Sequence, residues 1–345
     1  MTQRTLAGLL AVPLLAALWI LAATRPLPFV TYEPGLTVDV LASTDGDEII
    51  QVGDGQKTYR DDGQLRMTTV YVSQPTAHVN IFELMHDWIS DEDAVYPYSA
   101  VYQKGETTEQ NQQQGAVEMV SSQDAAIAVA LDELGYDVKP ALEVLSVVDG
   151  APADGKLKVR DILQEVDGAK IASTDDLTKA IDGATGEITL GVLRNGKPTT
   201  VRVTPGADGK IGIQFGLGYV FPFPVSVNID PSIGGPSAGL MFSLGIYDTL
   251  TPGSLTGGAT VAGTGTIDGD GKVGPIGGIQ QKIAGARNAG AQLFMVPPDN
   301  CADAVGAANG DMRLVKATTM HDAVEAIKAW VKDHDATLPS CEGTS

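Results

Sequence analysis

The stretch that decides the fold is DPSIGGPSAGLMFSLGIYD, residues 230–248. It predicts a helix whose apolar face carries Leu240, Met241, Leu244 and Tyr247. Pro236 suits the first turn of this helix, so Ser237 is expected at the helix N-terminus. A serine in that position is either the cap of the helix or a nucleophile beside the positive end of the helix dipole.

The backbone around Ser237 suits the nucleophile interpretation. Gly234 and Gly235 leave the preceding backbone without side chains. The amides of Gly235 and Ala238 are therefore expected to point at an oxyanion that develops next to the serine.

A lysine decides between the two interpretations. The stretch GTGTIDGDGKVGPIGGIQQK, residues 263–282, leads into a helix that is expected to end near Gly290. The apolar stripe of that helix contains Ile279, Lys282, Ile283 and Ala286. Either the lysine snorkels to the surface, or burial lowers its pKa from about 10.4 to roughly 7 or 8. A neutral amine can take a proton from a serine hydroxyl, as in Ser-Lys dyads.

These two stretches resemble the proteolytic domain of the Lon protease family over about residues 225–297. The sequence GPSAG around Ser237 is similar to the family's nucleophile motif, and the block from Thr264 to Lys282 is similar to the one that ends in its catalytic lysine. The resemblance implies a catalytic dyad of Ser237 and Lys282, which are 45 residues apart, with Thr264 orienting the lysine.

A segment with a different pattern, of short strands separated by turns, begins near Leu134. Over residues 142–204 we expect a strand, a Gly-Ala-Pro-Ala turn, a second strand, an Asp-Gly turn, a short helix and two more strands. This order resembles a bacterial PDZ domain. The resemblance implies a peptide-binding groove, with Leu134, Gly135 and Tyr136 in its carboxylate-binding loop and the helix over residues 175–181 as its other wall.

The chain departs from both families at a few positions. Thr266 replaces a glutamate in the Lon-like block, and Gln280 and Gln281 replace a charged pair. These positions lie outside the dyad. In the PDZ-like module Arg160 occupies a position that is usually glycine, which leaves the ligand preference of the groove open.

The N-terminal segment over residues 5–24 is uncharged and apolar. As a helix it would rise roughly 30 Å, enough to cross the hydrocarbon core of a bilayer. We expect an uncleaved anchor, and a cleaved signal peptide is the alternative, with weak small-residue signals at Ala22 and Thr24. Arg4 and Arg25 flank the segment and nearly balance, so they do not give its orientation.

Cysteine usage and charge limit the compartment and the partners. Cys301 and Cys341 are either free thiols or a bridge that ties down the C-terminal tail, and a bridge would place the body outside the cytoplasm. Neither cysteine has metal-ligand spacing, so we expect no metal. The 23 basic and 43 acidic residues give a formal net charge of −20, which disfavours a nucleic-acid partner.

Residues 191–198 nearly fit a phosphate-binding loop. Pro198 stands where that loop needs a hydroxyl, and Asn195 and Gly196 suit a two-residue hairpin turn. We therefore expect a hairpin, no bound nucleotide or other cofactor, and no ATP-driven motor.

The anchor, the PDZ-like module and the Lon-like domain together resemble the ATP-independent, membrane-anchored Lon-like proteases of Gram-positive bacteria and actinobacteria. In that subfamily the PDZ module interrupts the protease fold, which implies that the strands near residues 36–72 belong to the catalytic domain. The expected fold class is α+β. The expected domains are an anchor over 1–30, strands and helices packing with the protease over 31–124, a PDZ-like domain over 125–205, a Lon-like domain over 206–335 and a tail over 336–345.

Three functions fit parts of this pattern. Residues 235–239 also fit G-x-S-x-G, which with His321 suggests an α/β-hydrolase esterase, but the strong strand that should precede Ser237 is missing. A PDZ adaptor without catalysis would not explain why Lys282 lies on the apolar stripe of a helix. The prediction is a serine endopeptidase that cleaves extracytoplasmic or membrane-associated proteins or peptides, selected by the PDZ domain. The other histidines, expected to be structural or on the surface, are His78, His86 and His334.

Overall fold

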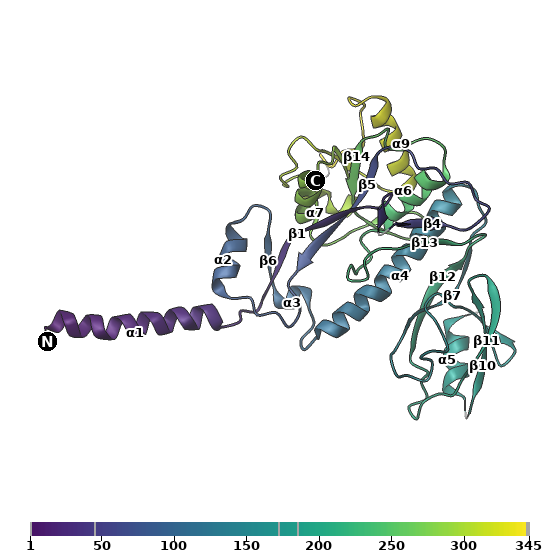
Figure 1. Cartoon of the computed structure of the whole chain (residues 1–345), viewed down its shortest axis with the longest axis horizontal. Helices are drawn as coiled ribbons and strands as arrows, with labels where there is room; N and C mark the ends of the chain where they lie inside the picture. Colours follow the sequence, from purple (N-terminus) through teal and green to yellow (C-terminus); the bar gives the residue numbers. More distant parts are fainter. Residues whose placement is uncertain (1, 45, 172, 185, 343–345) are drawn as a thin grey trace.

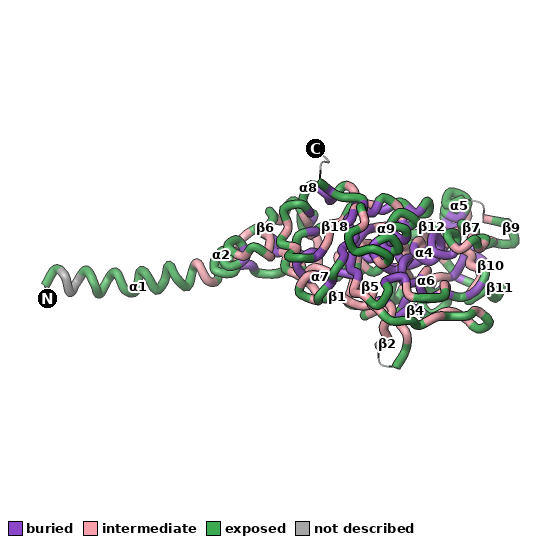
Figure 2. Tube along the Cα trace, turned by 90° about the horizontal axis from the view of Figure 1, so that it is seen from above, coloured by how far each residue is buried: buried purple, intermediate pink, exposed green. Residues whose placement is uncertain are grey.

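The computed structural model describes residues 2–44, 46–171, 173–184 and 186–342. It contains an N-terminal helix, a larger domain of helices and strands, and a smaller β-rich domain (Figure 1). Helix α1 (Gln3–Thr24) extends away from the body in both views (Figure 1, Figure 2). Its segment Ala7–Thr24 is long and apolar enough to cross a membrane, a property that signal sequences share.

The larger domain is built on a six-stranded mixed sheet. Its strands, in spatial order, are β18 (Arg313–Lys316), β17 (Leu293–Val296), β14 (Thr260–Gly263), β5 (Gln64–Val72), β1 (Phe29–Asp39) and β6 (Ala94–Pro97). The first four run parallel, and β1 and β6 add antiparallel pairings. Strands from before and after the β-rich domain thus share one sheet, so that domain is an insertion.

Both faces of this sheet are buried, which the β17 sequence LFMV explains. Leu293 and Met295 pack into one apolar core, whereas Phe294 and Val296 pack into another on the opposite face. The first core is covered by α4 (Thr108–Glu133), α6 (Gly239–Leu250) and α9 (Met320–Lys332), and the second by α7 (Ile279–Asn288) and α8 (Cys301–Ala304). The site residues come from elements on both faces.

Helix α4 begins well before the PDZ-like module, at Thr108, because Thr107 and Gln110 form a reciprocal capping box. The polar run over residues 109–114 is therefore helical.

The inserted domain has its own sheet and core. Its strands, in spatial order, are β11 (Lys197–Val203), β10 (Ile188–Arg194), β8 (Ile162–Val166), β7 (Lys139–Val147) and β12 (Ile213–Val220), with β9 (Ala169–Lys170) beside β8. Helix α5 (Thr174–Asp182) covers it through Leu177 and Ile181. Asn195 and Gly196, both at positive φ, close the β10–β11 hairpin, so the phosphate-loop-like sequence is a turn.

The domain limits differ from the expected ones. Residue 125 lies inside α4, whose Ala126, Ile127 and Leu131 belong to the core of the larger domain. The expected end at 205 precedes β12, which pairs with β7 along its whole length. The inserted domain therefore spans about residues 139–220, because a helix shared at the junction conceals the boundary in the sequence.

The remaining short elements also belong to the larger domain, and several of them contribute residues to its core. They are β2 (Ser43–Thr44), β3 (Asp47–Glu48), β4 (Ile50–Val52), α2 (Ile81–Ile89), α3 (Tyr98–Val101), β13 (Val225–Val227), β15 (Thr266–Ile267), β16 (Val273–Gly274) and the 3₁₀ turn η1 (Pro298–Asn300).

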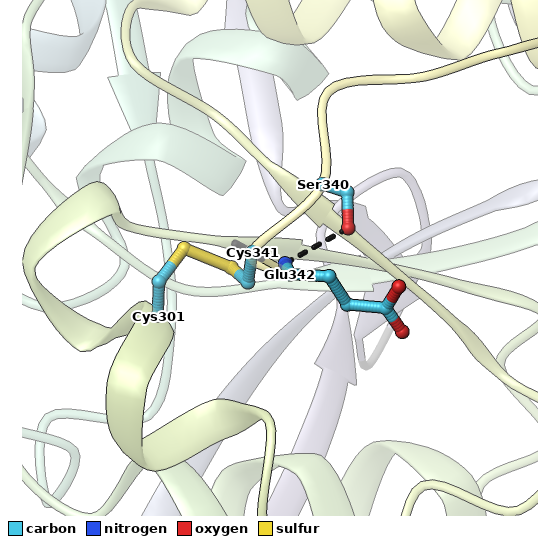
Figure 3. The surroundings of a disulfide bond; sticks show 4 residues. All are labelled: Cys301, Ser340, Cys341 and Glu342. Atoms are coloured by element: carbon cyan, nitrogen blue, oxygen red, sulfur yellow. Dashed lines mark hydrogen bonds between the residues drawn. A yellow bond between two sulfur atoms is a disulfide. The ribbon is translucent and has the colours of Figure 1, made fainter. Parts of the chain in front are cut away.

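The C-terminal segment is not a loose tail. Leu338 and Cys341 are buried, and Cys341 forms a disulfide with Cys301 at the start of α8 (Figure 3). Beside the bridge, the backbone N–H of Glu342 donates to Ser340 Oγ at 3.0 Å (Figure 3). The bridge closes the chain over α8 and brings the segment back to the protein core.

Candidate active site

Ser237 lies in the loop before α6, two residues ahead of Gly239. The helix therefore begins later than the sequence predicted, and Pro236 precedes its first turn. Helix α4 packs against this loop and stabilises it, because Ser122 Oγ donates to the carbonyl of Pro236 at 2.9 Å. The loop conformation follows from these tertiary contacts, which the local sequence does not encode.

The glycines before Ser237 serve the contact with α4. A Cβ atom on Gly234 would lie 3.2 Å from backbone atoms of Gly115, so a side chain here would push against the backbone of α4. The N–H of Gly235, at φ +92°, donates to the carbonyl of Gly115 at 2.9 Å.

The two predicted oxyanion donors, the amides of Gly235 and Ala238, differ in whether they are free to donate. The Gly235 amide is already bonded and is not free for an oxyanion, which corrects the expectation from sequence. Within the part of the chain that the structure describes, the Ala238 amide has no hydrogen-bond acceptor and adjoins Ser237. Ala238 remains a candidate donor.

Lys282 reaches Ser237 from helix α7. Gly278, at φ +68°, precedes the helix, and Lys282 lies on its buried side with only 2% of the residue exposed. Its Nζ lies 2.7 Å from Ser237 Oγ and 3.0 Å from Thr264 Oγ1. The side chain is therefore buried against two hydroxyl groups and does not snorkel.

Burial lowers the pKa of Lys282 to about 7. Desolvation is the cause, since it penalises the ammonium, and among the described residues no charged neighbour offsets it. A large fraction of the amine is thus neutral near neutral pH and can accept a proton.

Thr264 connects the two residues of the dyad. It is fully buried just after β14, and its hydroxyl donates to the carbonyl of Ser237 at 3.0 Å. The N–H of Gly265 donates to the same carbonyl at 2.9 Å. Thr264 thereby fixes both the serine loop and the lysine amine.

A cleft of about 880 Å³ opens at Ser237 and Lys282. One wall is the second half of β5, over residues 67–72, and another is the loop over residues 230–235. The α4 wall includes Asn111, Gln112 and Gln114, from the polar run to which the sequence gave no role. The capping box at Thr107 could have placed that run on a helix, but not in this cleft.

The structure places Leu134, Gly135 and Tyr136 at the C-terminal end of α4. Their N–H groups donate to the carbonyls of Ala130, Asp132 and Leu131, as in a glycine helix cap. The ring of Tyr136 packs edge-on against Phe223 in the larger domain. These amides are bonded within the cap and not free to hold a ligand carboxylate, so the geometry does not support the expected groove loop.

The histidines lie away from the dyad. His321 Nδ1 contacts Glu133 Oε1 at 2.7 Å, and this contact raises the pKa of His321. The partner of Ser237 is Lys282, so the arrangement lacks the serine–histidine pair of an esterase. His78 and His334 are exposed, whereas His86 lies with Asp87 and Asp93 in a group whose potential ligand atoms are within 4.8 Å of one another, a grouping that the sequence did not indicate.

Residues 231–328 match the family described as the Lon protease (S16) C-terminal proteolytic domain, a segment that includes Ser237, Thr264 and Lys282. Residues 117–204 match the PDZ domain family. The chain carries a Lon-type serine protease domain and a PDZ domain. The PDZ match includes the second half of α4 and ends before β12, so the sheet of the PDZ domain extends beyond the matched segment.

The chain is 38% identical over 78 residues to "Lon protease 2" of Bacillus subtilis (strain 168). The match covers 23% of this chain and 13% of the relative, so the chain spans only a small part of that protein. Two solved structures align with the PDZ domain, those of the PDZ domains of the SdrC-like proteins from Listeria innocua and Listeria monocytogenes. The L. innocua domain is 24% identical, and the alignment covers 22% of this chain and 92% of that one, with a TM-score of 0.20. The L. monocytogenes domain is 22% identical, and the alignment covers 22% of this chain and 86% of that one, also with a TM-score of 0.20.

Proposed function

We propose that the chain is an ATP-independent serine endopeptidase in which Ser237 is the nucleophile and Lys282 the general base. The observation that carries this proposal is the 2.7 Å approach of a buried amine, with its pKa lowered to about 7, to a serine hydroxyl that opens into a cleft. The Lon-type domain around these residues supports it.

The chemistry follows from the positions of the groups. Lys282 Nζ takes the proton of Ser237 while Oγ attacks the peptide carbonyl carbon, and the Ala238 amide stabilises the oxyanion. The ammonium then gives its proton to the departing amine as the peptide bond breaks. Water hydrolyses the resulting ester with the same lysine as base, which restores both side chains.

The cleft suits an extended peptide. Strand β14 pairs only with residues 64–67 of β5, so on that side the strand edge from Thr68 to Val72 has no strand partner in the described chain. This edge forms a wall of the cleft beside Lys282. A substrate backbone could add to it as a strand, an arrangement that binds many side-chain sequences.

Nucleotide independence and location are parts of the same proposal. The hairpin at Asn195 and Gly196 removes the only phosphate-loop-like sequence, and we infer that hydrolysis needs no ATP. We also infer that α1 anchors the chain with its catalytic body outside the cytoplasm, because a disulfide persists in oxidising compartments. The PDZ domain would then select extracytoplasmic or membrane-associated protein substrates.

The test is hydrolysis of a fluorogenic unstructured peptide by the purified chain without nucleotide. Cleavage that is abolished by Ser237→Ala, unchanged by added ATP and Mg²⁺ and unaffected by His321→Ala is the expected result. Activity that survives Ser237→Ala, or requires ATP, would overturn the proposal. Alkylation of the protein recovered from cells tests its location, since two reactive thiols would contradict the oxidising compartment.

A further inference from the structure

Helix α2 exposes a continuous apolar face. Ile81, Phe82, Met85, Trp88 and Ile89 are exposed and share this face at helical spacing, whereas the exposed Glu83 and His86 lie outside it. Trp88 is 72% and Ile89 76% exposed. The carboxylate of Asp87, by contrast, is buried toward the protein and has one oxygen without a hydrogen-bond partner. In water this arrangement exposes apolar groups that folding normally buries.

The position of α2 indicates what covers this face. The rings of Phe82 and Trp19 are in contact, with their centroids 5.1 Å apart, and both views place α2 beside the C-terminal end of α1 (Figure 1, Figure 2). Trp19 precedes Thr24 by five residues, so it lies roughly 7 to 8 Å inside the end of the apolar segment. Interfacial helices bury their apolar face to a similar depth, about 5 to 10 Å, and tryptophan is enriched there.

We propose that α2 is an interfacial helix that lies in the outer surface of the bilayer crossed by α1. The proposal rests on the proposed anchoring. Residues 80–93 contain no lysine or arginine and carry several acidic residues, so attraction to anionic lipid does not contribute. The ligand chemistry is the acyl-chain and glycerol region of zwitterionic phospholipid, which the apolar face enters.

Docking of α2 would fix the orientation of the protease body relative to the membrane surface. Helix α2 leads through β6 and α3 to Tyr102, which lines the cleft and donates to the carbonyl of Ser73 at 2.8 Å. With α1 and α2 both seated, the body has two attachments and loses rotation about the axis of the anchor. The cleft then keeps one orientation toward the membrane surface.

Tryptophan quenching by phosphatidylcholine brominated in its acyl chains tests this with the full chain in liposomes. The sequence has three tryptophans, and Trp330 is buried in the protein core. Trp19→Phe leaves Trp88 to report on α2, Trp88→Phe leaves Trp19 to report on the anchor, and the double variant gives the Trp330 background. The matched control is Leu217→Trp in the double variant, an exposed site on the distant strand β12 (Figure 1).

We expect the brominated lipid to remove about half of the Trp88 and Trp19 emission and to leave the emission of the Leu217→Trp control unaffected. If Trp19 is quenched and Trp88 is not, α1 is in the membrane but α2 is in water or against a second copy. That result would overturn the docking of α2 and leave the proposed anchoring intact. If Trp88 is quenched without Trp19, α2 docks and the anchoring is wrong. If neither is quenched, both fail. Ile89→Glu should also reduce the quenching of Trp88, because a charge in the apolar face opposes insertion.

Discussion

At the scale of single residues, the hydrogen bonds of Thr264 determine which way the dyad is polarised. Its one hydroxyl proton goes to the carbonyl of Ser237, so its oxygen has to accept an N–H from Lys282. A neutral amine has only one lone pair. With an N–H committed to Thr264, that lone pair is free to face Ser237 Oγ, which is what a general base requires.

The first prediction concerns the dyad. Ser237→Ala and Lys282→Ala should each reduce kcat/KM for a peptide by roughly 10⁴-fold or more, and the double variant should be scarcely worse, because the two residues act as one unit. Thr264→Ala should lose up to about tenfold, as expected for a hydrogen bond worth about 0.5–1.5 kcal/mol. Thr264→Ser, which keeps the hydroxyl, is the matched control. Additive losses in the double variant would contradict a shared mechanism.

The pH profile gives the second prediction. Below about 7 the ammonium of Lys282 cannot accept a proton, so kcat/KM should rise about tenfold per pH unit and level off above the lowered pKa. Stability should also rise from about pH 7 toward 10, because the unfolded chain retains the proton that the folded amine has lost. Lys282→Met should abolish activity and remove this part of the slope in thermal melts. A rate that falls as the pH rises through 7 would exclude the lysine as base.

At the scale of elements, a strained residue joins the PDZ domain to α4. Arg160 adopts φ +70°, a conformation that costs about 1–2 kcal/mol for a residue with a Cβ and explains why glycine is usual at the position. Its guanidinium pairs with the buried Asp124 at 3.2 Å and donates to Gln123 at 2.6 Å. Asp124 lies beside Glu143 of β7, and burial together with that negative charge raises the pKa of Glu143 to about 9.

The third prediction follows from this junction. Arg160→Ala keeps the strain and loses the ion pair, whereas Arg160→Gly loses the ion pair and relieves the strain. Both should lower the free energy of unfolding, by up to about 3 kcal/mol for an unpaired buried carboxylate, and the glycine variant should be about 1 kcal/mol more stable than the alanine variant. Denaturant titration measures both values. Adding Asp124→Asn to Arg160→Gly should restore part of the loss, and equal stability of the two single variants would refute the strain.

The elements also show how far the sequence can predict this fold. Periodicity located α7, the strands expected near residues 36–72 include β5, and the motifs located Ser237, Thr264 and Lys282, which the structure brings together. The sequence did not predict that α4 supports the loop that contains Ser237. The hydrogen bonds of Gly115 and Ser122 to that loop join residues more than 100 positions apart. The Gly235 assignment differed for the same reason, because the acceptor of its N–H, the carbonyl of Gly115, is distant in the sequence. The amides of Leu134, Gly135 and Tyr136 are instead bonded in a local helix cap, which the sequence analysis did not predict.

At the scale of the whole molecule, the insertion separates binding from chemistry. The PDZ domain has its own core, and the residues of the dyad, the cleft and the serine loop all come from the larger domain. Both ends of the insertion return to the protease core, where Val138 and Phe221 pack. The chain could therefore be rejoined there without crossing the active site.

The last prediction uses this separation. Residues 139–220 are replaced by a short Gly-Ser linker, and Asp124→Asn is added because Arg160 leaves with the domain. Hydrolysis of a small unstructured peptide should remain within a fewfold of the parent, since Ser237, Thr264 and Lys282 keep their contacts, whereas cleavage of a folded protein substrate should fall by a larger factor. The matched control is full-length Asp124→Asn, and thermal melts establish that each variant is folded. Equal loss on both substrates in a folded deletion variant would mean that the PDZ domain supports the dyad itself and does not deliver substrate.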